Sequence, residues 1–495
     1  MNKINIVYPK KIGKIEPEVY GHFTEHIGGV MYDGMYVGDK EYGDKNGFRK
    51  FIVDKIKEIN APVIRWPGGC FAEIYNWRDG IGENRPVRNS WWTCKDGRLE
   101  PNKVGTHEFM NLCEYIGAKA YFAVNVTSAT VLDAIEWMDY CTSKPDTTTL
   151  SKLRERNGRK EPFDVAYIGI GNENWGGGGN MRPEYYADLY RKYATLLNQM
   201  PFEKKLIAGG PNDDDYNWTH KFFESIEKSE KHIDGYSIHY YCSYLNPDDD
   251  PVNFKEDNWY WLLRNASKME ELIDRHWAII KGHGMDKKCK LVIDEWGAWH
   301  REGSGPSKGA NLYEQQSTMR DAMVAAITLN IFNNNADKIM MTNVAQLVNN
   351  LHSLFLASED KCVATPNYHI FDMFKNHQNA TALEVVTQCG EVVYKDKDNN
   401  EFPMKSLSVS ASEKDGKITV TIGNLSYDED AEIELCTLGA NQSQKLKVTT
   451  LTHKDLCAHN TFENPDNVVP TETIIKGNVI NVPKGSVIAI EYEII

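Results

Sequence analysis

The stretch "VAYIGIGNENWGGGGN", residues 165–180, changes abruptly from an unbroken apolar run to a carboxylate surrounded by glycines. An apolar run without polar alternation is typical of a strand that is buried on both faces of a parallel sheet. Glu173 follows this run almost directly. A carboxylate at the end of such a strand, in a glycine-lined cleft, can keep its proton near neutral pH when its surroundings are apolar. The stretch therefore predicts a buried strand that ends in a reactive acid.

The glycines of this stretch raise a second interpretation, a loop that wraps a phosphate. They stand at positions 169, 171 and 176–179, which fit neither GxGxxG nor GxxxxGK[ST]. Asn174 stands where the third glycine of GxGxxG belongs, and no lysine follows. We therefore favour the reactive carboxylate over the phosphate loop.

Seven more runs of the same kind occur between residues 17 and 348, and segments with helical periodicity separate them. The other runs are "EVYGHFTEH", "APVIRWPGG", "KAYFAVNV", "KLIAGGP", "DGYSIHYY", "KLVIDEWG" and "KIMMTNVAQLV". The helical segments include "GFRKFIVDKIKEIN", "RPEYYADLYRKYATLLNQM" and "NLYEQQSTMRDAMVAAITLNIF". Eight strand–helix units over this length predict an α/β fold, a (β/α)8 TIM barrel with insertions, over residues 16–382.

Nearly every one of these runs changes at its carboxyl end from apolar residues to polar or aromatic ones. In a TIM barrel the carboxyl ends of the eight strands meet at one face, which carries the active site. We therefore expect one opening to be surrounded by these residues: Glu25, Arg65, Asn125, Glu173, Asn212, Tyr241, Glu295 and Gln346.

From residue 383 to 495 the pattern changes to short segments that alternate apolar and polar residues between Gly, Asn and Asp turns. "KITVTIGNLS" and "NVINVPKGSVIAIEYEI" are examples. This alternation predicts an antiparallel β-sandwich of jelly-roll type. The opening segment, residues 1–15, includes the strand-like "INIVYP" and is expected to join that sandwich.

Composition and charge exclude several classes of protein. Lys and Arg number 56 against 70 Asp and Glu, so the net charge of −14 disfavours binding to nucleic acid. No apolar run is long enough to span a membrane, and the N-terminal segment lacks the apolar core of a signal peptide. Ten scattered cysteines without a CxxC pair indicate reduced, cytoplasmic usage rather than disulfides or a metal site.

The motif "LVIDEWGAWH" supplies a second carboxylate, Glu295, at the end of the seventh run. Residues on the fourth and seventh strands of a barrel can face one another across the opening. Two carboxylates about 5–5.5 Å apart let one act as a nucleophile and the other as an acid and then a base. The alternative is that Asp294 and Glu295 are merely solvated loop charges, and a lone DEWG motif would not decide between the two.

Residues His22, Glu25 and His26 match the HxxEH pattern of some zinc proteases, which requires a helix. Here glycines flank the pattern and a strand precedes it, so we expect Glu25 to point into the cleft with the histidines packed around it.

In "VIRWPGGCF", Arg65 can orient a carboxylate through paired hydrogen bonds or form a structural salt bridge. Cys70 lacks a nearby base and is predicted to be a packing residue that lines the pocket.

The sixth run carries His239 and Tyr241 in "YSIHYY". A tyrosine hydroxyl can donate to a neighbouring carboxylate and help to keep it ionised. The alternative for both residues is an ordinary place in the core. Gln346 in "NVAQLVNN" can bind sugar hydroxyls or be purely structural.

Six motifs, "GHFTEH", "RWPGG…NWRDGIG", "GIGNENWG", "IHYY", "DEWG" and "NVAQLVN", occur here in this order. Their set and order resemble α-L-arabinofuranosidases of glycoside hydrolase family 51, over about residues 16–376. The resemblance implies a retaining, exo-acting hydrolase of terminal α-L-arabinofuranosyl groups in arabinan, arabinoxylan or their oligosaccharides. It also implies a cytoplasmic homo-oligomer, commonly a hexamer, that needs no cofactor or metal.

The resemblance assigns roles by motif position, with Glu173 as the general acid/base and Glu295 as the nucleophile. The residues implied to orient the nucleophile are Arg65, His239 and Tyr241. The residues implied to contact the sugar are Glu25, Cys70, Asn172, Tyr241, Gln346 and Trp299. Either Trp91 or Trp92 is expected to complete the wall of the pocket.

One departure from the family pattern is Cys70, where well-known members carry Asn directly after "PGG". A thiol is a poorer hydrogen-bond partner than an amide, so this sugar contact is expected to differ.

The sequence leaves two other functions open. One is a retaining endo-xylanase or endoglucanase with the same pair of carboxylates. Such an enzyme needs an open cleft and an exo-acting one a closed pocket, and the insertion at residues 242–261 can wall off one side. The other is a non-catalytic carbohydrate-binding barrel.

Overall fold

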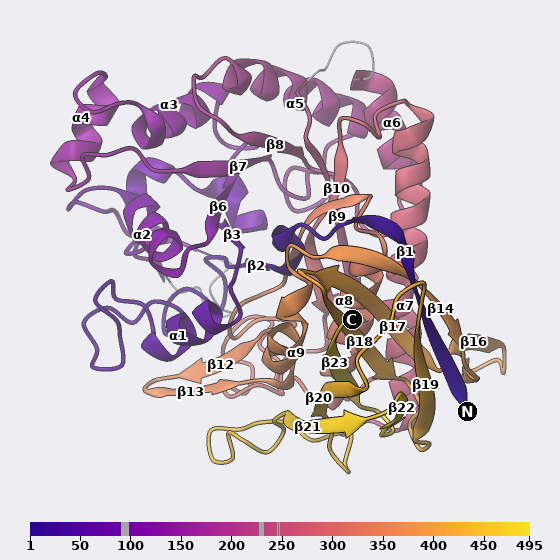
Figure 1. The fold of residues 1–495 in the computed structure, drawn as a ribbon. Helices are drawn as coiled ribbons and strands as arrows, with labels where there is room; N and C mark the ends of the chain where they lie inside the picture. The colour runs from indigo at the N-terminus through magenta and orange to yellow at the C-terminus, as the bar shows by residue number, and fades with distance from the viewer. Residues whose placement is uncertain (91–98, 227–231, 245, 247) are drawn as a thin grey trace.

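The eight apolar runs form eight parallel strands that close into a barrel (Figure 1). The computed structural model describes residues 1–90, 99–226, 232–244, 246 and 248–495. In chain order the barrel strands are β2 (Gly21–Phe23), β3 (Val63–Trp66), β6 (Lys119–Val124), β7 (Val165–Ile170), β8 (Lys205–Ala208), β9 (Gly235–Cys242), β10 (Lys290–Ala298) and β11 (Ile339–Val344). Strand β11 pairs back to β2, which closes the circle. The predicted TIM barrel is therefore confirmed.

Helices alternate with the barrel strands along the chain. They are α1 (Lys50–Glu58), α2 (Thr106–Ile116), α3 (Val131–Thr142), α4 (Thr149–Arg156), α5 (Pro183–Asn198), α6 (Tyr216–Ile226), α7 (Glu256–Gly282), α8 (Met319–Asn334) and α9 (Pro366–Phe374). Short 3-10 helices η1 (Pro17–Tyr20), η2 (Cys70–Ile74), η3 (Trp77–Gly80) and η4 (Lys375–His377) lie in the connections. No helix in the described ranges is both long and apolar enough to cross a membrane.

Helix α8 begins later than its sequence pattern predicts. The pattern extends from residue 311, but the helix starts only at Met319. Thr318 caps it by accepting a hydrogen bond from the Arg320 backbone, while the Asp321 carboxylate accepts one from the Thr318 N–H. This capping box fixes the start of the helix. Before it, the Glu314 side chain accepts a hydrogen bond from the Ser307 backbone, which holds residues 311–318 in a loop.

The remaining strands build a nine-stranded sheet in the order β21-β20-β23-β18-β17-β14-β1-β19-β22. Their bounds are β1 (Asn2–Lys14), β14 (Thr381–Gln388), β17 (Leu407–Lys414), β18 (Lys417–Asn424), β19 (Ala431–Leu438), β20 (Lys445–Leu451), β21 (Thr471–Lys476), β22 (Val479–Val482) and β23 (Val487–Glu493). Three two-stranded hairpins accompany it: β4 (Arg88–Asn89) with β5 (Leu99–Glu100), β12 (Phe355–Ser358) with β13 (Lys361–Ala364), and β15 (Glu391–Lys395) with β16 (Glu401–Lys405).

This sheet curls over a core of its own. Thr437 on β19 hydrogen bonds to the Tyr492 hydroxyl on β23 at 2.7 Å, although four strands separate them in the sheet order. The inward side chains of these strands, such as Ile4, Ile433 and Ile490, share one apolar cluster. The N-terminal strand joins the sheet as expected, but β1 runs parallel to β19, so the sheet is antiparallel everywhere except at this pair.

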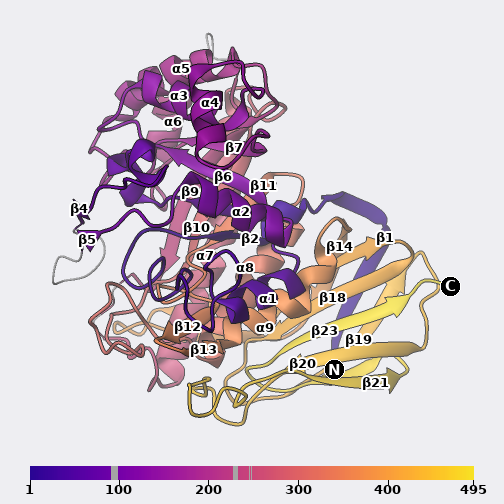
Figure 2. The same cartoon turned by 90° about the vertical axis from the view of Figure 1, so that its left-hand side faces the viewer.

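The sheet packs beside the barrel, and both chain termini lie in it (Figure 2). Helix α8 forms much of the contact through amide side chains. Asn330 accepts hydrogen bonds from Ser410 and Thr421, and Asn333 donates to Ser410. The interface is therefore specified by polar pairs as well as by packing, which fixes the position of α8 and the loop before it.

Candidate active site

The structure brings Glu173 and Glu295 together at the carboxyl ends of the barrel strands. Glu173 lies in the turn after β7 with a positive φ of 42°, and Glu295 lies near the end of β10. Nδ1 of His239 is 2.9 Å from Glu173 Oε1 and 3.5 Å from Glu295 Oε2. One oxygen of each carboxylate and a ring nitrogen of His239 all lie within 4.8 Å of one another. We call Glu173, Glu295, His239 and their neighbours Arg65 and Asp294 the carboxylate site.

Glu295 is held from both of its oxygens. Arg65 donates to Oε1 at 2.8 Å, and the Tyr241 hydroxyl donates to Oε2 at 2.7 Å. A second nitrogen of Arg65 donates to Asn172 Oδ1 at 2.5 Å. Burial, followed by the charges of Glu295 and Glu173, raises the pKa of Tyr241 well above its usual value, so the hydroxyl stays a donor. These contacts hold Glu295 in a fixed orientation.

Asp294 is also buried, which contradicts the alternative that it is a solvated loop charge. It accepts hydrogen bonds from Ser237, from the Tyr121 hydroxyl at 2.7 Å and from His239 Nε2 at 3.1 Å. Burial opposes its ionised form, but Arg65 and the His239 hydrogen bond hold the pKa of Asp294 well below its usual range. The register of β10 shifts between Val292 and Glu295, which lets two consecutive residues contact the barrel interior.

His239 carries a proton on each ring nitrogen. Burial alone would lower its pKa, but the charge of Glu295 and the hydrogen bonds with Asp294 and Glu173 raise the pKa of His239 to about 10. At neutral pH the imidazolium therefore donates from Nε2 to Asp294 and from Nδ1 to Glu173. The ring of His239 therefore links Glu173, after β7, to Asp294 on β10.

Glu25 forms a third buried carboxylate beside this pair. Its oxygens accept hydrogen bonds from the Phe71 backbone and from Gln346 Nε2, both at 3.0 Å. Burial, and then the charge of Glu295, raises the pKa of Glu25 to about 7. Gln346 Oε1 is buried and has no hydrogen-bond partner among the described residues. The two side chains thus form a polar corner next to Glu295.

Cys70 and Asn172 lie against Glu173. Cys70 Sγ is 3.5 Å from Glu173 Oε2 and 3.7 Å from Asn172 Nδ2. Burial and the charge of Glu173 raise the pKa of Cys70, which keeps it a thiol rather than a thiolate. The structure therefore supports a lining residue and not a nucleophile at position 70.

Aromatic residues form a wall beside the carboxylate site. The Trp299 ring packs on Tyr241 at 5.1 Å, on Tyr244 at 5.0 Å and on Tyr313 at 4.8 Å between ring centroids. Tyr244 comes from the insertion at residues 242–261, so part of that insertion does lie next to Trp299. Trp91 and Trp92 lie outside the described residues.

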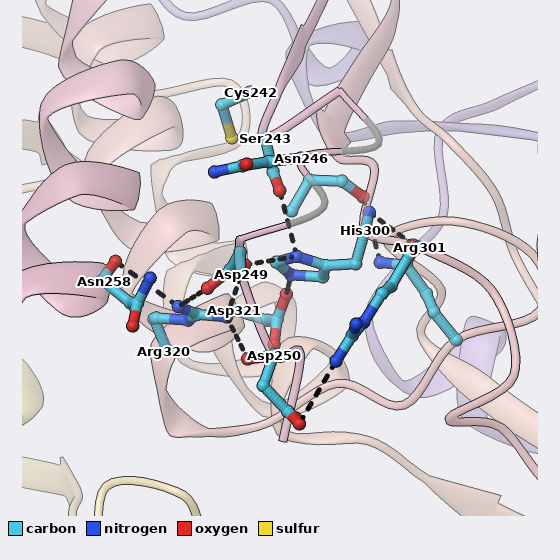
Figure 3. A network of polar contacts seen from close by, with 12 residues as sticks. Cys242, Ser243, Asn246, Asp249, Asp250, Asn258, His300, Arg301, Arg320 and Asp321 are labelled. Atoms are coloured by element: carbon cyan, nitrogen blue, oxygen red, sulfur yellow. Dashed lines mark hydrogen bonds and ion pairs between the residues drawn. The ribbon is translucent and has the colours of Figure 1, made fainter. Parts of the chain in front are cut away.

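A cluster of buried charges anchors this wall (Figure 3). Asp249, from the same insertion, accepts two hydrogen bonds from Arg320 at 2.8 and 3.0 Å. His300, which follows Trp299, lies between Asp249 and Asp321 at 3.1 and 2.9 Å. We call Asp249, His300, Arg320 and Asp321 the anchor cluster. It connects two cleft loops to the start of α8.

Several predicted residues do not join the site. Asn125 uses its amide to hold the loop after β6, through the Tyr75 carbonyl and Ser128, and Asn212 is exposed to solvent. Both strands end at the same face of the barrel. The Asn125 side chain, however, hydrogen bonds within its own loop, and the Asn212 side chain lies in solvent. His26 bonds to Glu100 and Trp66. The HxxEH pattern lies on a strand and a turn, not on a helix.

Glu73 is a residue that the sequence analysis missed. Its carboxylate is 2% exposed and accepts four hydrogen bonds from the loops after β6 and β7. Asp294 was noted only as an alternative loop charge, and Ser237 and Tyr121, which bond to it, were not singled out. An acidic residue within an apolar segment, such as Glu73 in "CFAEIY", is the signal that could have drawn attention to it.

The cavities of the described structure do not by themselves identify this site. A space of about 10 Å³ lies beneath the carboxylates, lined by residues that include Arg65, Glu173 and His239. This is about the room that one water needs. A cavity of about 470 Å³ lies between η2, β6 and α3. Of the predicted site residues only Asn125 lines it, and no residue of the carboxylate site does.

The spacing of Glu173, His239 and Glu295 is also compatible with a bound metal ion. Their contacts with one another are, however, those of hydrogen-bonded partners, with His239 Nδ1 2.9 Å from Glu173 Oε1. Arg65 adds a positive charge at Glu295. The arrangement is better suited to proton transfer and nucleophilic attack than to a metal centre.

Comparison with known proteins identifies the family. Residues 55–256 match the family model described as alpha-L-arabinofuranosidase 1 domain, and residues 294–486 match that described as alpha-L-arabinofuranosidase C-terminal domain. A Bacteroides ovatus protein named intracellular exo-alpha-L-arabinofuranosidase is 39% identical over 97% of this chain and 93% of its own length.

Two solved structures extend the comparison to the fold. The family 51 arabinofuranosidase from Xanthomonas axonopodis pv. citri is 35% identical with a TM-score of 0.92, and both chains are covered completely. An alpha-L-arabinofuranosidase from Thermotoga maritima, solved as an arabinose complex, is 28% identical with a TM-score of 0.87 over the full length of both chains. This chain therefore belongs to the α-L-arabinofuranosidases of glycoside hydrolase family 51.

Proposed function

We propose that this protein is a retaining, exo-acting α-L-arabinofuranosidase. It releases terminal non-reducing α-L-arabinofuranosyl groups from arabinan, arabinoxylan or their oligosaccharides. The observation that carries the retaining mechanism is the approach of Glu173 and Glu295, with an oxygen of each within 4.8 Å. Retaining glycosidases place their carboxyl groups about 5–5.5 Å apart, whereas inverting enzymes leave about 6.5–9.5 Å for a water.

Glu295 acts as the nucleophile in this proposal. Arg65 and Tyr241 donate hydrogen bonds to its two oxygens, which fixes the orientation of the carboxylate. Glu295 forms a bond to the anomeric carbon while Glu173 gives its proton to the glycosidic oxygen, which leaves with the aglycone. The product of this step is a covalent arabinosyl ester on Glu295.

Glu173 then acts as the base. A water gives its proton to Glu173 and attacks the anomeric carbon, and arabinose is released with retained configuration. His239 bonds to Oε1, so Oε2, which faces Cys70, is the oxygen that exchanges the proton.

The furanose hydroxyls bind to the polar corner in this assignment. Glu25 and Gln346 accept and donate there, and a sugar hydroxyl would give Gln346 Oε1 the partner it lacks among the described residues. Asn172 and Cys70 contact the sugar near Glu173, and Trp299 walls the pocket. An exo-acting enzyme needs a closed pocket, and in this proposal Trp299 forms one of its walls.

Product analysis tests the proposal. With an aryl α-L-arabinofuranoside, we expect NMR to detect the α-anomer of arabinose first, before mutarotation. With linear arabinan, single arabinoses should accumulate from the start. Internal cuts in linear arabinan or xylan would instead support the endo-acting alternative, and an inert wild type would support the non-catalytic one.

The variant Glu173→Ala tests the acid/base assignment. A substrate with a good leaving group, such as the 2,4-dinitrophenyl arabinofuranoside, needs little protonation, so its bond cleavage should persist. Hydrolysis of the ester should become slow, and azide should accelerate turnover because it attacks without a base. Wild-type enzyme should not respond to azide. Failure of azide to rescue the variant would move the acid/base role away from Glu173.

We further propose that the enzyme works in the cytoplasm as a homo-oligomer, with a hexamer as the expected state, and without a cofactor. None of the nine described cysteines forms a disulfide, which suits a reducing compartment. Light scattering on the purified protein measures the assembly. A monomer at micromolar concentration would overturn this part of the proposal.

A further inference from the structure

Glu73 occupies an unusual position for a carboxylate with no established role. It lies on η2, three residues after Cys70, and its side chain is buried. Oε1 accepts hydrogen bonds from the Asn172 backbone at 2.8 Å and from Asn174 Nδ2 at 2.9 Å. These two residues flank Glu173 on either side.

The other oxygen holds a second loop. Oε2 of Glu73 accepts hydrogen bonds from the backbone N–H groups of Val126 at 2.8 Å and Thr127 at 2.9 Å, in the loop after β6. The Thr127 hydroxyl in turn donates to the Gly178 carbonyl at 2.5 Å. One carboxylate therefore joins the ends of two neighbouring barrel strands.

The loop that Glu73 holds adopts a backbone conformation that needs support. Glu173 itself has a φ of 42°, a region that residues other than glycine occupy at a cost. Gly178 packs so tightly that an added Cβ would lie 1.7 Å from the Asn172 carbonyl oxygen. Such a turn persists when surrounding contacts determine it, and two of these contacts come from Glu73.

We infer that Glu73 is a positioning residue that sets the orientation of Glu173 for proton transfer to the leaving group. This inference rests on the proposed role of Glu173 and extends it to a residue that touches neither substrate nor reacting atoms. All four partners of Glu73 are donors, and no lysine, arginine or histidine forms an ion pair with it in the described part of the chain. Burial raises the pKa of Glu73, while these four hydrogen bonds act in the opposite direction and favour the carboxylate form. The cradle thus offers donors to both oxygens of a carboxylate.

The variant Glu73→Gln tests this requirement. Its amide nitrogen would face two N–H donors whichever oxygen it replaces, so two of the four hydrogen bonds are lost and one loop is released. The matched control is Glu18→Gln. Glu18 is equally buried, but it bonds to Lys119 at the start of β6, at the opposite end of the barrel.

The readout is the dependence of kcat/KM on the leaving group, because kcat/KM reports bond cleavage. We expect Glu73→Gln to lower kcat/KM for phenyl and methyl α-L-arabinofuranosides roughly 10–100-fold, since these need a well-placed acid. The value for the 2,4-dinitrophenyl substrate should change by less than about threefold, because this leaving group needs little acid. Glu18→Gln should lower kcat/KM by the same factor for all of these substrates, or leave it unchanged.

An equal loss on every substrate in Glu73→Gln would overturn the inference and leave Glu73 as a structural residue. A similar leaving-group dependence in Glu18→Gln would also overturn it, because the effect would then be a general consequence of lost stability. A wild type that is inert on all of these arabinofuranosides would instead refute the proposed function, before the two variants are compared.

Discussion

The anchor cluster and the carboxylate site are built from the same types of residue: one histidine, one arginine and acidic side chains. In the anchor cluster, His300 contacts both Asp249 and Asp321, and Arg320 forms two hydrogen bonds with Asp249 (Figure 3). The side chains of Asp249 and Asp321 are 1% and 0% exposed. Although burial disfavours the charged ring, Asp321 and Asp249 raise the pKa of His300. Every charge in this cluster thus has a strong partner of opposite sign.

The carboxylate site repeats this pattern with one difference. His239 contacts Asp294 and Glu173, and Arg65 pairs with Asp294 and Glu295. The Glu173 side chain, however, is 18% exposed, and its Oε2 has only a thiol beside it among the described residues. A thiol is a weak donor.

The difference shows what separates a catalytic cluster from a structural one in this fold. Buried ion pairs of arginine, histidine and carboxylates occur in both, so their presence does not identify an active site. What marks the carboxylate site is an acid, Glu173, whose side chain is partly exposed and whose Oε2 has only a weak hydrogen-bond partner, while its neighbours are fixed. The two clusters should therefore respond differently to equivalent changes.

The largest expected difference concerns Glu295. Glu295→Gln keeps the size of the side chain but removes the nucleophile, so kcat on an aryl α-L-arabinofuranoside should fall by about 10⁴-fold or more. Steady-state assays of the purified variant measure this loss, and circular dichroism checks that the fold is retained. Turnover near that of the wild type would show that Glu295 is not the nucleophile.

The equivalent change in the anchor cluster is Asp321→Asn. It leaves the buried charge of His300 without its nearest partner, so the free energy of unfolding should fall by about 3–5 kcal/mol. Urea unfolding followed by tryptophan fluorescence measures this loss. Activity per folded molecule should stay within about threefold of the wild type. A loss of turnover as large as that in Glu295→Gln would mean that the two clusters do not divide stability and catalysis as described.

The protonation of His239 gives a smaller, pH-dependent effect. The pKa of His239 is raised from 6.5 to about 10 in the folded protein. A raised pKa contributes stability that is fully present below pH 6.5 and is lost as the pH rises through about 10. We expect wild type to be more stable than His239→Asn at pH 6, and this difference to shrink by about 1–3 kcal/mol toward pH 10. Urea unfolding of both proteins across this range measures it.

His300 is present in both proteins of this pH comparison, so its own titration cancels in the difference. A difference in stability that stays constant with pH would show that the ring of His239 is not protonated in the native site. Urea unfolding of His300→Asn over the same pH range measures the contribution of the anchor cluster separately. In this variant, turnover per folded molecule should show the same dependence on pH as in the wild type.

Much of the fold could be predicted from the sequence because the strands of a parallel barrel are buried on both faces. Their apolar runs are unbroken, and the change to polar residues marks the carboxyl ends, as in β7 and β10. The parallel pairing of β1 with β19 could not be predicted in this way. It joins segments more than 400 residues apart, and an alternating pattern does not specify the direction of a partner strand.

The site was only partly predictable for a related reason. The eight strand ends indicated Glu25, Glu173 and Glu295, but not which other ends turn inward. Asn125 closes a loop instead of joining the site, and this depends on its local hydrogen bonds. The contribution of Asp294 depends on a register shift within β10, because strict alternation would send it to the opposite face from Glu295.

The smallest expected effect concerns the weak contact of Glu173. In Cys70→Ser a hydroxyl replaces the thiol 3.5 Å from Glu173 Oε2. A hydroxyl is the stronger donor and should hold Oε2 in its ionised form, which makes Glu173 more like the aspartates of the anchor cluster. We expect kcat/KM for phenyl α-L-arabinofuranoside to fall roughly 2–10-fold, the effect of one added hydrogen bond on the ground state.

The control for this change is Cys389→Ser, at a half-buried cysteine of the sheet domain, which should leave kcat/KM unchanged. The 2,4-dinitrophenyl substrate should also be little affected by Cys70→Ser, because it does not require the proton of Glu173. If kcat/KM fell by the same factor for the phenyl and the dinitrophenyl substrate, the added hydroxyl would act on the binding of the sugar and not on proton transfer from Glu173. The contrast between the two clusters would then rest on the partial exposure of Glu173 alone, since the thiol would no longer account for its freedom to exchange a proton.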